Sequence, residues 1–204
     1  MERKAHWEDV YRTKAPEAVS WYQTQAGRSL ELVREFAPDR RAAIIDVGGG
    51  ASTLVDELVS EGFSDLTVLD LSGAALAEAR QRLGALAAGV HWVEADALEV
   101  HLPRASVDLW HDRAVFHFLT STDDQRRYVE QIRNAVKPGG HVVMATFAED
   151  GPTQCSGLTV QRYSPESLCA VFGPGFQLVH TSRETHVTPA GSEQAFIYCV
   201  FRVN

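Results

Sequence analysis

Short apolar runs alternate with amphipathic segments along most of the chain, and this alternation predicts its secondary structure. Five apolar runs have the length and composition of buried strands, at residues 42–47, 66–69, 90–93, 107–110 and 141–147. Apolar residues at helical spacing predict helices within residues 29–37, 54–61, 73–86 and 122–137, and another from Pro165 onward. Two longer strands are expected at 177–188 and 194–203, on either side of a turn at 189–192.

Residues that begin or end helices agree with this pattern. Gly62 stands where the C-terminal cap of the second helix belongs, and Ser72 is suited to cap the third. Thr122 or Asp123 is expected to cap the fourth helix, which the Pro138–Gly140 segment ends before the strand at 141–147. Strands that alternate with helices predict an α/β fold with a mostly parallel, seven-stranded sheet, and the last strand pair predicts an antiparallel hairpin at one side.

Residues 1–27 differ from the rest of the chain. They are polar and aromatic, with Trp7, Tyr11, Trp21 and Tyr22 among charged residues, and they lack a strong helical period. The regular pattern begins near residue 28, and a chain of 204 residues is long enough for one well-buried domain. We therefore expect a single domain, with residues 1–27 as a separate segment on a core of residues 28–204.

Composition narrows the classes of partner and environment. The formal net charge is −8, which disfavours a nucleic-acid substrate. Cys155, Cys169 and Cys199 are widely spaced and form no metal-ligand or disulfide pattern, which fits a reducing cytoplasm. The first residues do not resemble a signal peptide, and no apolar run approaches the ~20 residues of a membrane span. The sequence thus predicts a cytoplasmic protein that binds neither membrane nor metal.

Acidic residues recur where the predicted strands end. Asp46 precedes Gly48, Gly49 and Gly50, and Asp70, Asp96 and Asp112 follow later strands. Asp70 lies 20 residues after Gly50, the interval at which a nucleotide-binding βαβ unit places the carboxylate that takes ribose hydroxyls. Four carboxylates in one cleft would repel phosphates, and no Gly-Lys-Ser/Thr follows the glycines. Thr53 also stands where the dinucleotide fingerprint has glycine. The pattern favours a positively charged nucleoside without phosphates.

The Asp46–Gly50 segment resembles the first motif of the class I S-adenosylmethionine-dependent methyltransferases, which have a Rossmann-like fold. The likeness extends from about residue 42 to residue 204 and includes residues 107–112, residues 137–141 and the last hairpin. It implies that Gly48 and Gly50 approach the cofactor, and that Asp46 helps to hold its amino-acid end. The resemblance further assigns Asp70, with Leu71, to the ribose hydroxyls, and Asp96, with the backbone of Ala97, to the adenine amino group. S-adenosylmethionine is then the cofactor and S-adenosylhomocysteine its product.

The aromatic segment near the N-terminus looks like the lid of a subgroup that includes protein-lysine and small-molecule methyltransferases. The resemblance implies that Trp7, Tyr11, Trp21 and Tyr22 cover the methionine end of the cofactor, where a sulfonium gains cation–π attraction from an aromatic face. These aromatic residues are equally consistent with simple packing of the segment on the body.

Methyl transfer needs an aligned nucleophile, and a base if that nucleophile is protonated. Asp112, Arg113 and His117 are the candidates for catalysis beside the fourth strand, and Asp112 also for cofactor contact. Asp112 and Arg113 are as consistent with an internal ion pair, and His117 fits a buried core histidine better than a catalytic one. Cys155 fits an ordinary loop cysteine better than a substrate contact.

The combined pattern predicts a methyltransferase that acts on a small molecule, because little chain remains for a macromolecule-binding domain. A protein-lysine methyltransferase with a basic protein substrate is the first alternative, and a shallow acceptor groove would favour it. An NAD-dependent oxidoreductase and a non-catalytic cofactor-binding protein are the others. The acceptor and the oligomeric state do not follow from the sequence.

Overall fold

The computed structural model describes residues 2–204, in which a single twisted sheet has the strand order β3–β2–β1–β4–β5–β9–β8. Its strands are β1 (Ala43–Val47), β2 (Asp65–Asp70), β3 (Val90–Glu94), β4 (Val107–Arg113), β5 (Val136–Phe147), β8 (Phe176–Val187) and β9 (Glu193–Val203). Neighbours from β3 to β5 pair in parallel, whereas β9 pairs antiparallel with both β5 and β8. The predicted Rossmann-like, mostly parallel sheet with an antiparallel hairpin is confirmed.

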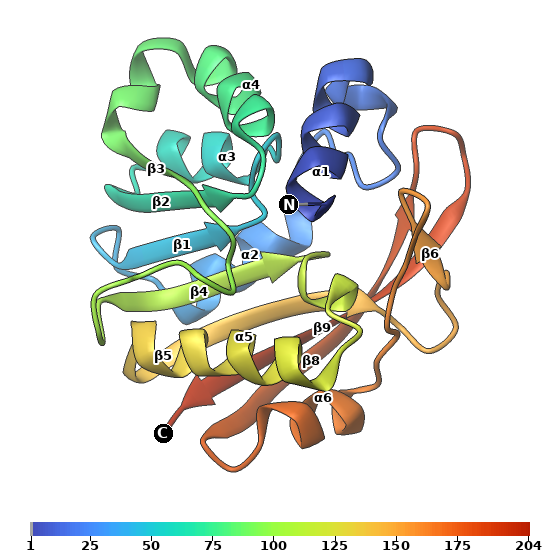
Figure 1. The fold of residues 1–204 in the computed structure, drawn as a ribbon. Helices are drawn as coiled ribbons and strands as arrows, with labels where there is room; N and C mark the ends of the chain where they lie inside the picture. Colours follow the sequence, from blue (N-terminus) through green and yellow to red (C-terminus); the bar gives the residue numbers. More distant parts are fainter. Residues whose placement is uncertain (1) are drawn as a thin grey trace.

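Helices cover both faces of the sheet (Figure 1). The helices α2 (Gly27–Phe36), α3 (Leu54–Ser60) and α4 (Gly73–Leu83) bury their apolar residues in one core cluster, and α5 (Thr122–Ala135) and α6 (Pro165–Phe172) in the other. Successive side chains of a strand point to opposite faces, so Ile44 of β1 enters the first cluster and Ile45 the second. Each such buried side chain contributes about 1.5–3 kcal/mol of hydrophobic stabilisation.

The predicted capping residues are confirmed at α3 and α4, whereas the predicted N-cap of α5 differs by one residue from the observed one. Ser72 caps α4 and accepts a hydrogen bond from the Ala75 N–H at 3.2 Å. Gly62 follows α3 with a φ of +84°, a conformation that favours glycine. The cap of α5 is Ser121 rather than the expected Thr122 or Asp123, because the Ser121 hydroxyl accepts a bond from the Asp124 N–H at 3.2 Å.

The boundary between α5 and β5 also differs from the expectation. The helix ends at Ala135, and β5 begins at Val136 rather than at residue 141. Val136 pairs with Val107 of β4, and a register shift then accommodates the Pro138–Gly140 segment before pairing resumes at His141. The proline and glycines therefore form an irregularity within the strand, which a local pattern does not distinguish from a loop.

Part of the N-terminal segment is helical although its sequence lacks a strong helical period. Glu2–Thr13 form helix α1, which packs against α4, and a short 3₁₀ turn follows at Pro16–Ala18. Among residues 3–13 of α1, Val10 alone is buried, so the helix has little of the apolar periodicity by which sequence patterns reveal helices. Its docking on the body, described below, supplies the stabilisation that its own sequence does not display.

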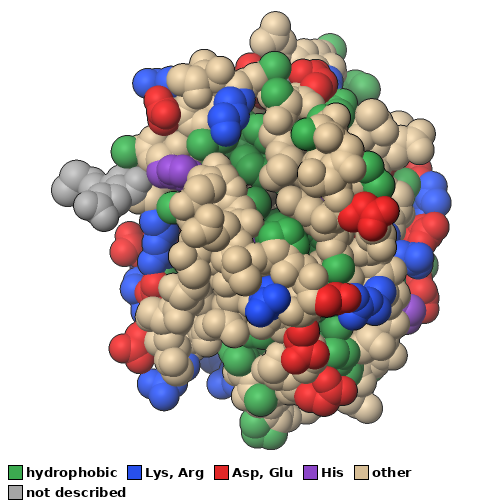
Figure 2. Space-filling view, turned by 90° about the vertical axis from the view of Figure 1, so that its right-hand side faces the viewer, with side chains coloured by type: hydrophobic (Ala, Val, Ile, Leu, Met, Phe, Trp, Pro, Cys, Tyr) green, Lys and Arg blue, Asp and Glu red, His purple; other side chains and the backbone are tan. Residues whose placement is uncertain are grey.

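The carboxyl ends of the parallel strands point toward α1, and the site lies between them (Figure 1). A small hairpin of β6 (Gln154–Cys155) and β7 (Leu158–Thr159) contributes to the same end of the molecule. Seen from this end, hydrophobic side chains gather in a hollow near the middle of the face (Figure 2). Ligands of open α/β sheets bind at this position, beyond the carboxyl ends of the strands.

Candidate functional site

Two adjoining cavities lie at the carboxyl ends of β1, β2 and β4. The first has a volume of about 120 Å³, and Asp70, Leu71, Asp96 and Ala97 are among the residues that line it. The second, of about 50 Å³, is lined in part by Asp46. Tyr11, Trp21, Gly48 and Arg113 line both cavities, so the two are neighbouring parts of one site. Of the four carboxylates that were expected in one cleft, Asp112 is the one that lines neither cavity.

The glycine segment after β1 brings backbone close to these cavities. Gly48 has a φ of +68°, and a Cβ there would lie 2.0 Å from a methyl carbon of Val115. A Cβ on Gly50 would lie 2.5 Å from Oδ2 of Asp70. Larger residues at either position would therefore displace a residue of the site, and the conformation at Gly48 is itself unfavourable for them.

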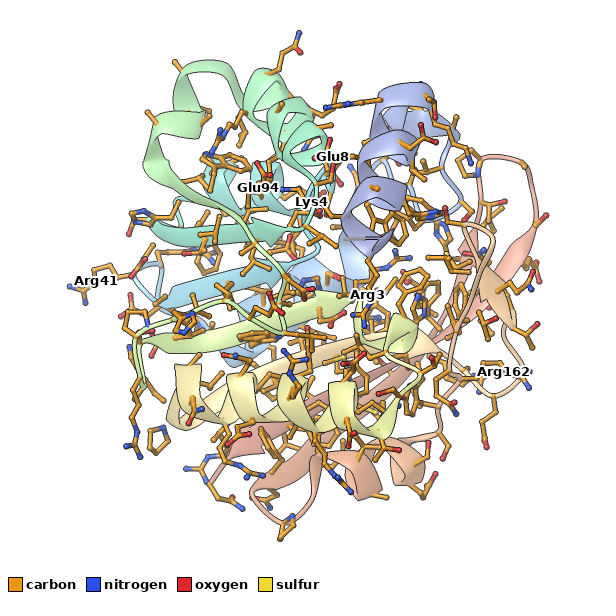
Figure 3. The ribbon with its side chains drawn as sticks, viewed as in Figure 1. Arg3, Lys4, Glu8, Arg41, Glu94 and Arg162 are labelled. Atoms are coloured by element: carbon orange, nitrogen blue, oxygen red, sulfur yellow. The ribbon has the colours of Figure 1, made fainter. Side chains whose placement is uncertain are left out.

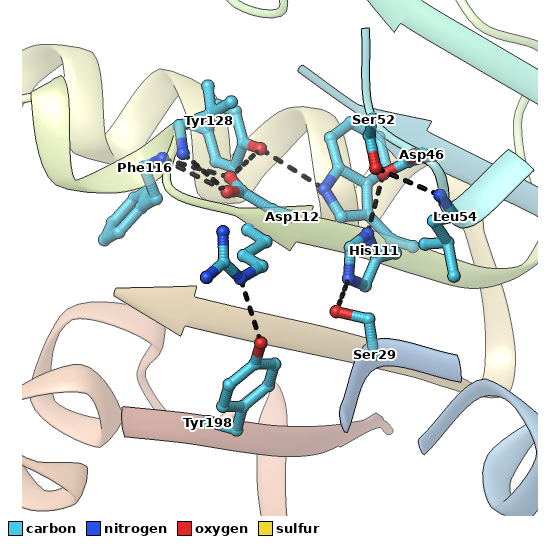
Figure 4. Close-up of polar contacts among 12 residues, drawn as sticks. Ser29, Asp46, Ser52, Leu54, His111, Asp112, Phe116, Tyr128 and Tyr198 are labelled. Atoms are coloured by element: carbon cyan, nitrogen blue, oxygen red, sulfur yellow. Dashed lines mark hydrogen bonds and ion pairs between the residues drawn. The ribbon is translucent and has the colours of Figure 1, made fainter. Parts of the chain in front are cut away.

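Asp46 is held by a buried polar chain that reaches α2 (Figure 4). Its Oδ1 lies 2.7 Å from Nδ1 of His111, whose Nε2 lies 2.9 Å from the hydroxyl of Ser29. All three side chains are buried. The other carboxylate oxygen, Oδ2, is buried in the wall of the second cavity without a hydrogen-bond partner among the described residues. A buried oxygen in this state requires a donor, and an ammonium group suits it.

Asp70 ends β2 at the wall of the first cavity. Its Oδ1 accepts a hydrogen bond from the Ser72 N–H at 2.8 Å, and only 7% of the residue is exposed. Burial is the largest influence on its ionisation and raises the pKa of this carboxyl to about 7. Burial disfavours the charged form of this carboxyl because it removes water. Hydrogen bonds from the hydroxyl groups of a ligand would replace that water and stabilise the carboxylate.

Asp112 fixes the loop that follows β4. It accepts hydrogen bonds from the Val115 N–H at 2.9 Å, from the Phe116 N–H at 3.1 Å and from the Tyr128 hydroxyl (Figure 4). The side chain is completely buried, and this burial raises its pKa to about 6. Its hydrogen-bonding capacity is used inside the protein, and it does not pair with Arg113.

Arg113, the last residue of β4, points away from Asp112 toward the antiparallel strands. Its Nε donates to the Tyr198 hydroxyl at 3.1 Å, and Nη1 donates to the Trp21 carbonyl at 3.3 Å. The third nitrogen, Nη2, lies 3.7 Å from Glu184 and has no hydrogen-bond partner among residues 2–204. The expected Asp112–Arg113 ion pair is therefore replaced by a contact with β8.

His117 lies beneath the site rather than in it. Its ring is fully buried against Phe118 and Phe147, at centroid distances of 4.5 and 4.7 Å. Neither ring nitrogen has a partner in the described part of the chain, and burial lowers the pKa of the imidazole to about 3. It lines neither cavity, which agrees with the core interpretation.

The aromatic residues of the N-terminal segment meet at the cavities. Trp7 packs edge-on against Trp21 and Phe118 at 5.6 and 5.1 Å between ring centroids. The Trp21 indole N–H donates to the Tyr11 hydroxyl at 3.2 Å. Trp7, Tyr11 and Trp21 line the first cavity, whereas Tyr22 lines only the second.

Polar contacts hold α1 across the opening of the first cavity (Figure 3). Glu8 accepts a hydrogen bond from the Gly73 N–H at 2.6 Å, at the N-terminus of α4, where a carboxylate is favoured. Lys4 pairs with Glu94, the last residue of β3, and Arg3 pairs with Asp124 at the start of α5 at 2.5 Å. The helix thus bridges three elements that surround the cavity.

Several residues of the site had no signal in the sequence. Glu8 and Arg3 act through partners 65 and 121 positions away. Cys155, which the sequence favours as an ordinary loop cysteine, is buried and lines the first cavity. His6 adds a 3.3 Å contact with Ser156, between α1 and the small hairpin. Only the folded chain brings these distant segments together.

Residues 2–204 contain neither a metal-binding cluster nor a membrane-spanning helix. No group of His, Cys, Asp and Glu side chains within that part of the chain is arranged to hold a metal ion. No helix there is both long and apolar enough to cross a membrane.

Comparisons with known proteins agree with this geometry. A family model described as a methyltransferase domain matches residues 44–140. The eEF1A lysine and N-terminal methyltransferase of Bos taurus is 22% identical over 138 residues, which are 68% of this chain and 19% of that protein. The ubiquinone biosynthesis O-methyltransferase of Pectobacterium carotovorum is 30% identical over 145 residues, 70% of this chain and 53% of that one. The chain spans between about a fifth and about half of the length of these two relatives.

Solved structures share the fold. The 1,6-didemethyltoxoflavin-N1-methyltransferase of Burkholderia thailandensis, solved with S-adenosylhomocysteine, superimposes with a TM-score of 0.69 at 19% identity, covering 100% of this chain and 84% of that one. The residues at the two cavities also fit such a cofactor. The buried carboxyl of Asp70 could accept hydrogen bonds from hydroxyl groups, and the unpartnered Oδ2 of Asp46 could accept one from an ammonium group. The family match, the shared fold and the geometry of the site together support a class I S-adenosylmethionine-dependent methyltransferase domain with S-adenosylmethionine as its cofactor.

Proposed function

We propose that this chain transfers the methyl group of S-adenosylmethionine to a small-molecule acceptor. The observation that carries the proposal is that α1 covers the site, which is a partly enclosed cavity rather than a flat groove. The first cavity, of about 120 Å³, lies under α1, and Cys155 of the small hairpin also lines it. A compact molecule suits such a chamber better than the surface of a folded protein does, because the latter needs an open groove.

The proposed cofactor contacts follow from the two cavities. Asp70 and Leu71 would take the ribose, and Asp96 with Ala97 would take the adenine, all at the wall of the first cavity. In the second cavity, Asp46 would hold the ammonium group of the methionine moiety. Gly48 and Gly50 have no Cβ, so the protein backbone there could come close to the cofactor. Bound in this way, the cofactor supplies an activated methyl group.

The protein's own part in this reaction is alignment and the exclusion of water. Residues 1–27 would serve as a lid, in which Trp7, Tyr11 and Trp21 supply the aromatic wall and Glu8 fastens α1 to α4. Asp112 would hold the loop after β4 in position. The lid must open for the cofactor to enter and close for methyl transfer.

Addition of S-adenosylhomocysteine is expected to slow amide hydrogen exchange in residues 5–25. The bound nucleoside gives the aromatic side chains of the lid a surface to pack on, which favours the closed state. Mass spectrometry of exchanged peptides measures the effect, and peptides from β8 serve as the internal control. Equal exchange of residues 5–25 with and without the ligand would mean that the segment is simply packed on the body.

A protein-lysine methyltransferase is the second candidate, because relatives such as the bovine protein carry that name. Incubation with S-adenosylmethionine and separate pools of small thiols, phenols, carboxylic acids and amines tests the choice, alongside a lysine-rich peptide and a folded basic protein. We expect S-adenosylhomocysteine to form with a small-molecule pool and to stay at background with both polypeptides. Turnover with a polypeptide alone would favour the second candidate.

A further inference from the structure

The charged residues that line the first cavity are divided between its two sides. Asp70 ends β2 and Asp96 follows β3, both on one side of β1 in the sheet, and both belong to the proposed nucleoside site. Arg113 ends β4 on the other side of β1, and Arg3 approaches from α1. Among the described residues, no carboxylate lines the cavity on that second side.

The remaining lining of that side is mainly apolar, with the Tyr11 hydroxyl as a polar exception. Trp7, Trp21, Phe118 and Cys155 supply aromatic rings and a buried thiol. Such walls favour a flat, apolar molecule, because they offer contact area but few hydrogen bonds. The acceptor's polar atom then has Arg113 as its nearest charged neighbour on the sheet.

The guanidinium of Arg113 has hydrogen-bonding capacity left over. Only 9% of its side chain is exposed, and Nη2 is buried without a hydrogen-bond partner in the described structure. Glu184 lies 3.7 Å away and offsets part of the charge, but it also accepts a bond from the Tyr198 hydroxyl at 3.0 Å. The other titratable neighbour on β8 is His186, whose pKa is lowered by burial and by Arg113, so it adds no second positive charge near neutral pH. A small shift of this side chain would give an anion a charge-assisted hydrogen bond.

The residues around this side of the cavity are poor proton acceptors. Burial raises the pKa of the Cys155 thiol to about 11 and raises that of the Tyr11 hydroxyl still further, so both keep their protons at neutral pH. Asp112 is occupied by internal hydrogen bonds, and His117 does not reach the cavity. A nucleophile that arrives already ionised needs no base, whereas an ammonium group would require one and would meet the charge of Arg113.

Building on the proposed small-molecule function, we infer that the acceptor is an apolar molecule whose nucleophile is an anion, a thiolate or a phenolate, held by Arg113. The proton of the thiol or phenol leaves to solvent before the reaction. The anion then attacks the methyl carbon, the carbon–sulfur bond of the sulfonium breaks, and its electron pair stays on the sulfur of S-adenosylhomocysteine. The products are a neutral thioether or ether and neutral sulfide, so charge balances. Arg113 is then a residue that determines acceptor specificity.

The ionisation of bound probes tests this assignment. 4-Nitrothiophenol and 4-nitrophenol absorb differently as anions, so their pKa values are measured by titrating each probe on the protein saturated with S-adenosylhomocysteine. The wild-type protein is expected to lower the pKa of at least one probe by about one to two pH units, as a nearby opposite charge does. Arg113→Gln should abolish the shift, and Arg113→Lys should keep part of it. The probe that is shifted more identifies the sulfur or oxygen class.

A second variant separates acceptor binding from structural pairing. Glu184→Gln removes the competing carboxylate and should lower the probe's pKa further, because Arg113 is left with a stronger unbalanced charge. If Arg113 and Glu184 served only to stabilise the fold, Arg113→Gln and Glu184→Gln would change the stability of the protein and leave the pKa of the bound probe unchanged. Arg183→Gln, an exposed change on the same strand, is the control for loss of one positive charge.

Three results would overturn the inference. The first is a probe pKa that is the same in wild type and in a folded Arg113→Gln protein. The second is benzylamine binding more tightly than either nitro probe. The third is a tenfold or larger loss of S-adenosylhomocysteine affinity in Arg113→Gln without an effect on probe ionisation, which would assign Arg113 to the cofactor's carboxylate. Because these tests measure binding and ionisation, they can fail while the acceptor survey still finds a small-molecule substrate.

Discussion

Replacement of Asp70 by alanine is expected to weaken the binding of S-adenosylhomocysteine on the order of 10- to 150-fold. Hydrogen bonds from ribose hydroxyls to a carboxylate are worth about 1.5–3 kcal/mol, and Asp70 is buried at the cavity wall where the ribose is proposed to lie. Isothermal titration calorimetry measures the change. Asp65→Ala, an exposed substitution at the other end of β2, is the matched control and should leave the affinity unchanged.

The same residue predicts a pH dependence of affinity. Burial raises the pKa of Asp70 to about 7 in the ligand-free protein, and donors on the bound ribose stabilise the ionised form. Affinity should therefore be constant above pH 7 and fall about tenfold for each pH unit below it, until the pKa of the bound form is reached. Asp70→Asn should remove this dependence while the protein stays folded.

The contribution of Asp70 to folding stability depends on pH in the opposite direction to its contribution to affinity. A carboxyl with a raised folded-state pKa contributes its stability below its unfolded pKa of 3.8 and loses it as the pH rises through about 7. Asp70→Asn should therefore raise the melting temperature of the ligand-free protein at pH 8, and this gain should shrink toward pH 4. Unchanged affinity and an unchanged pH profile in a folded Asp70 variant would exclude this residue from the cofactor site.

Replacement of Asp112 by asparagine is expected to lower the melting temperature by about 5–10 °C. The carboxylate accepts from two backbone N–H groups and one hydroxyl in a fully buried position, and an amide places donors where acceptors are needed. Such a loss costs about 2–3 kcal/mol, and each kcal/mol lowers the melting temperature of a chain of this size by about 2–4 °C. Calorimetric or spectroscopic melting measures the change.

Tyr128→Phe is the matched control for that experiment. It removes only the hydroxyl that donates to Asp112 and leaves both backbone bonds, so its melting temperature should fall less. If Asp112 instead deprotonates the acceptor, Asp112→Asn would keep its stability and lose turnover by about 10²-fold or more. That combination would contradict a positioning role for Asp112.

The part of the fold that follows local rules was accessible from the sequence. The strands β1, β2 and β4 are short runs with apolar residues buried on both faces, and Ser72 and Gly62 act on residues only a few positions away. The same locality explains why Asp70 lies at the end of β2 and at the wall of the first cavity, as the sequence pattern predicted, since its position depends on the end of one strand. The irregular start of β5 was missed because pairing with β4 decides it.

The remainder of the site depends on tertiary contacts that no local pattern encodes. Helix α1 was missed because its attachment consists mainly of polar contacts, such as Glu8 with Gly73, rather than an apolar stripe. The sequence also left open whether Asp112 and Arg113 pair with each other. Adjacent residues of a strand point to opposite faces, so Arg113 faces Glu184 of β8 while Asp112 faces Tyr128 of α5.

The central claim is that the two cavities together bind S-adenosylmethionine as a methyl donor. Calorimetric titration of the wild-type chain with S-adenosylhomocysteine, in parallel with NAD, tests it most directly. The account predicts one saturable site for S-adenosylhomocysteine and binding of NAD at least tenfold weaker. Tight binding of NAD, with no heat from S-adenosylhomocysteine, would contradict it.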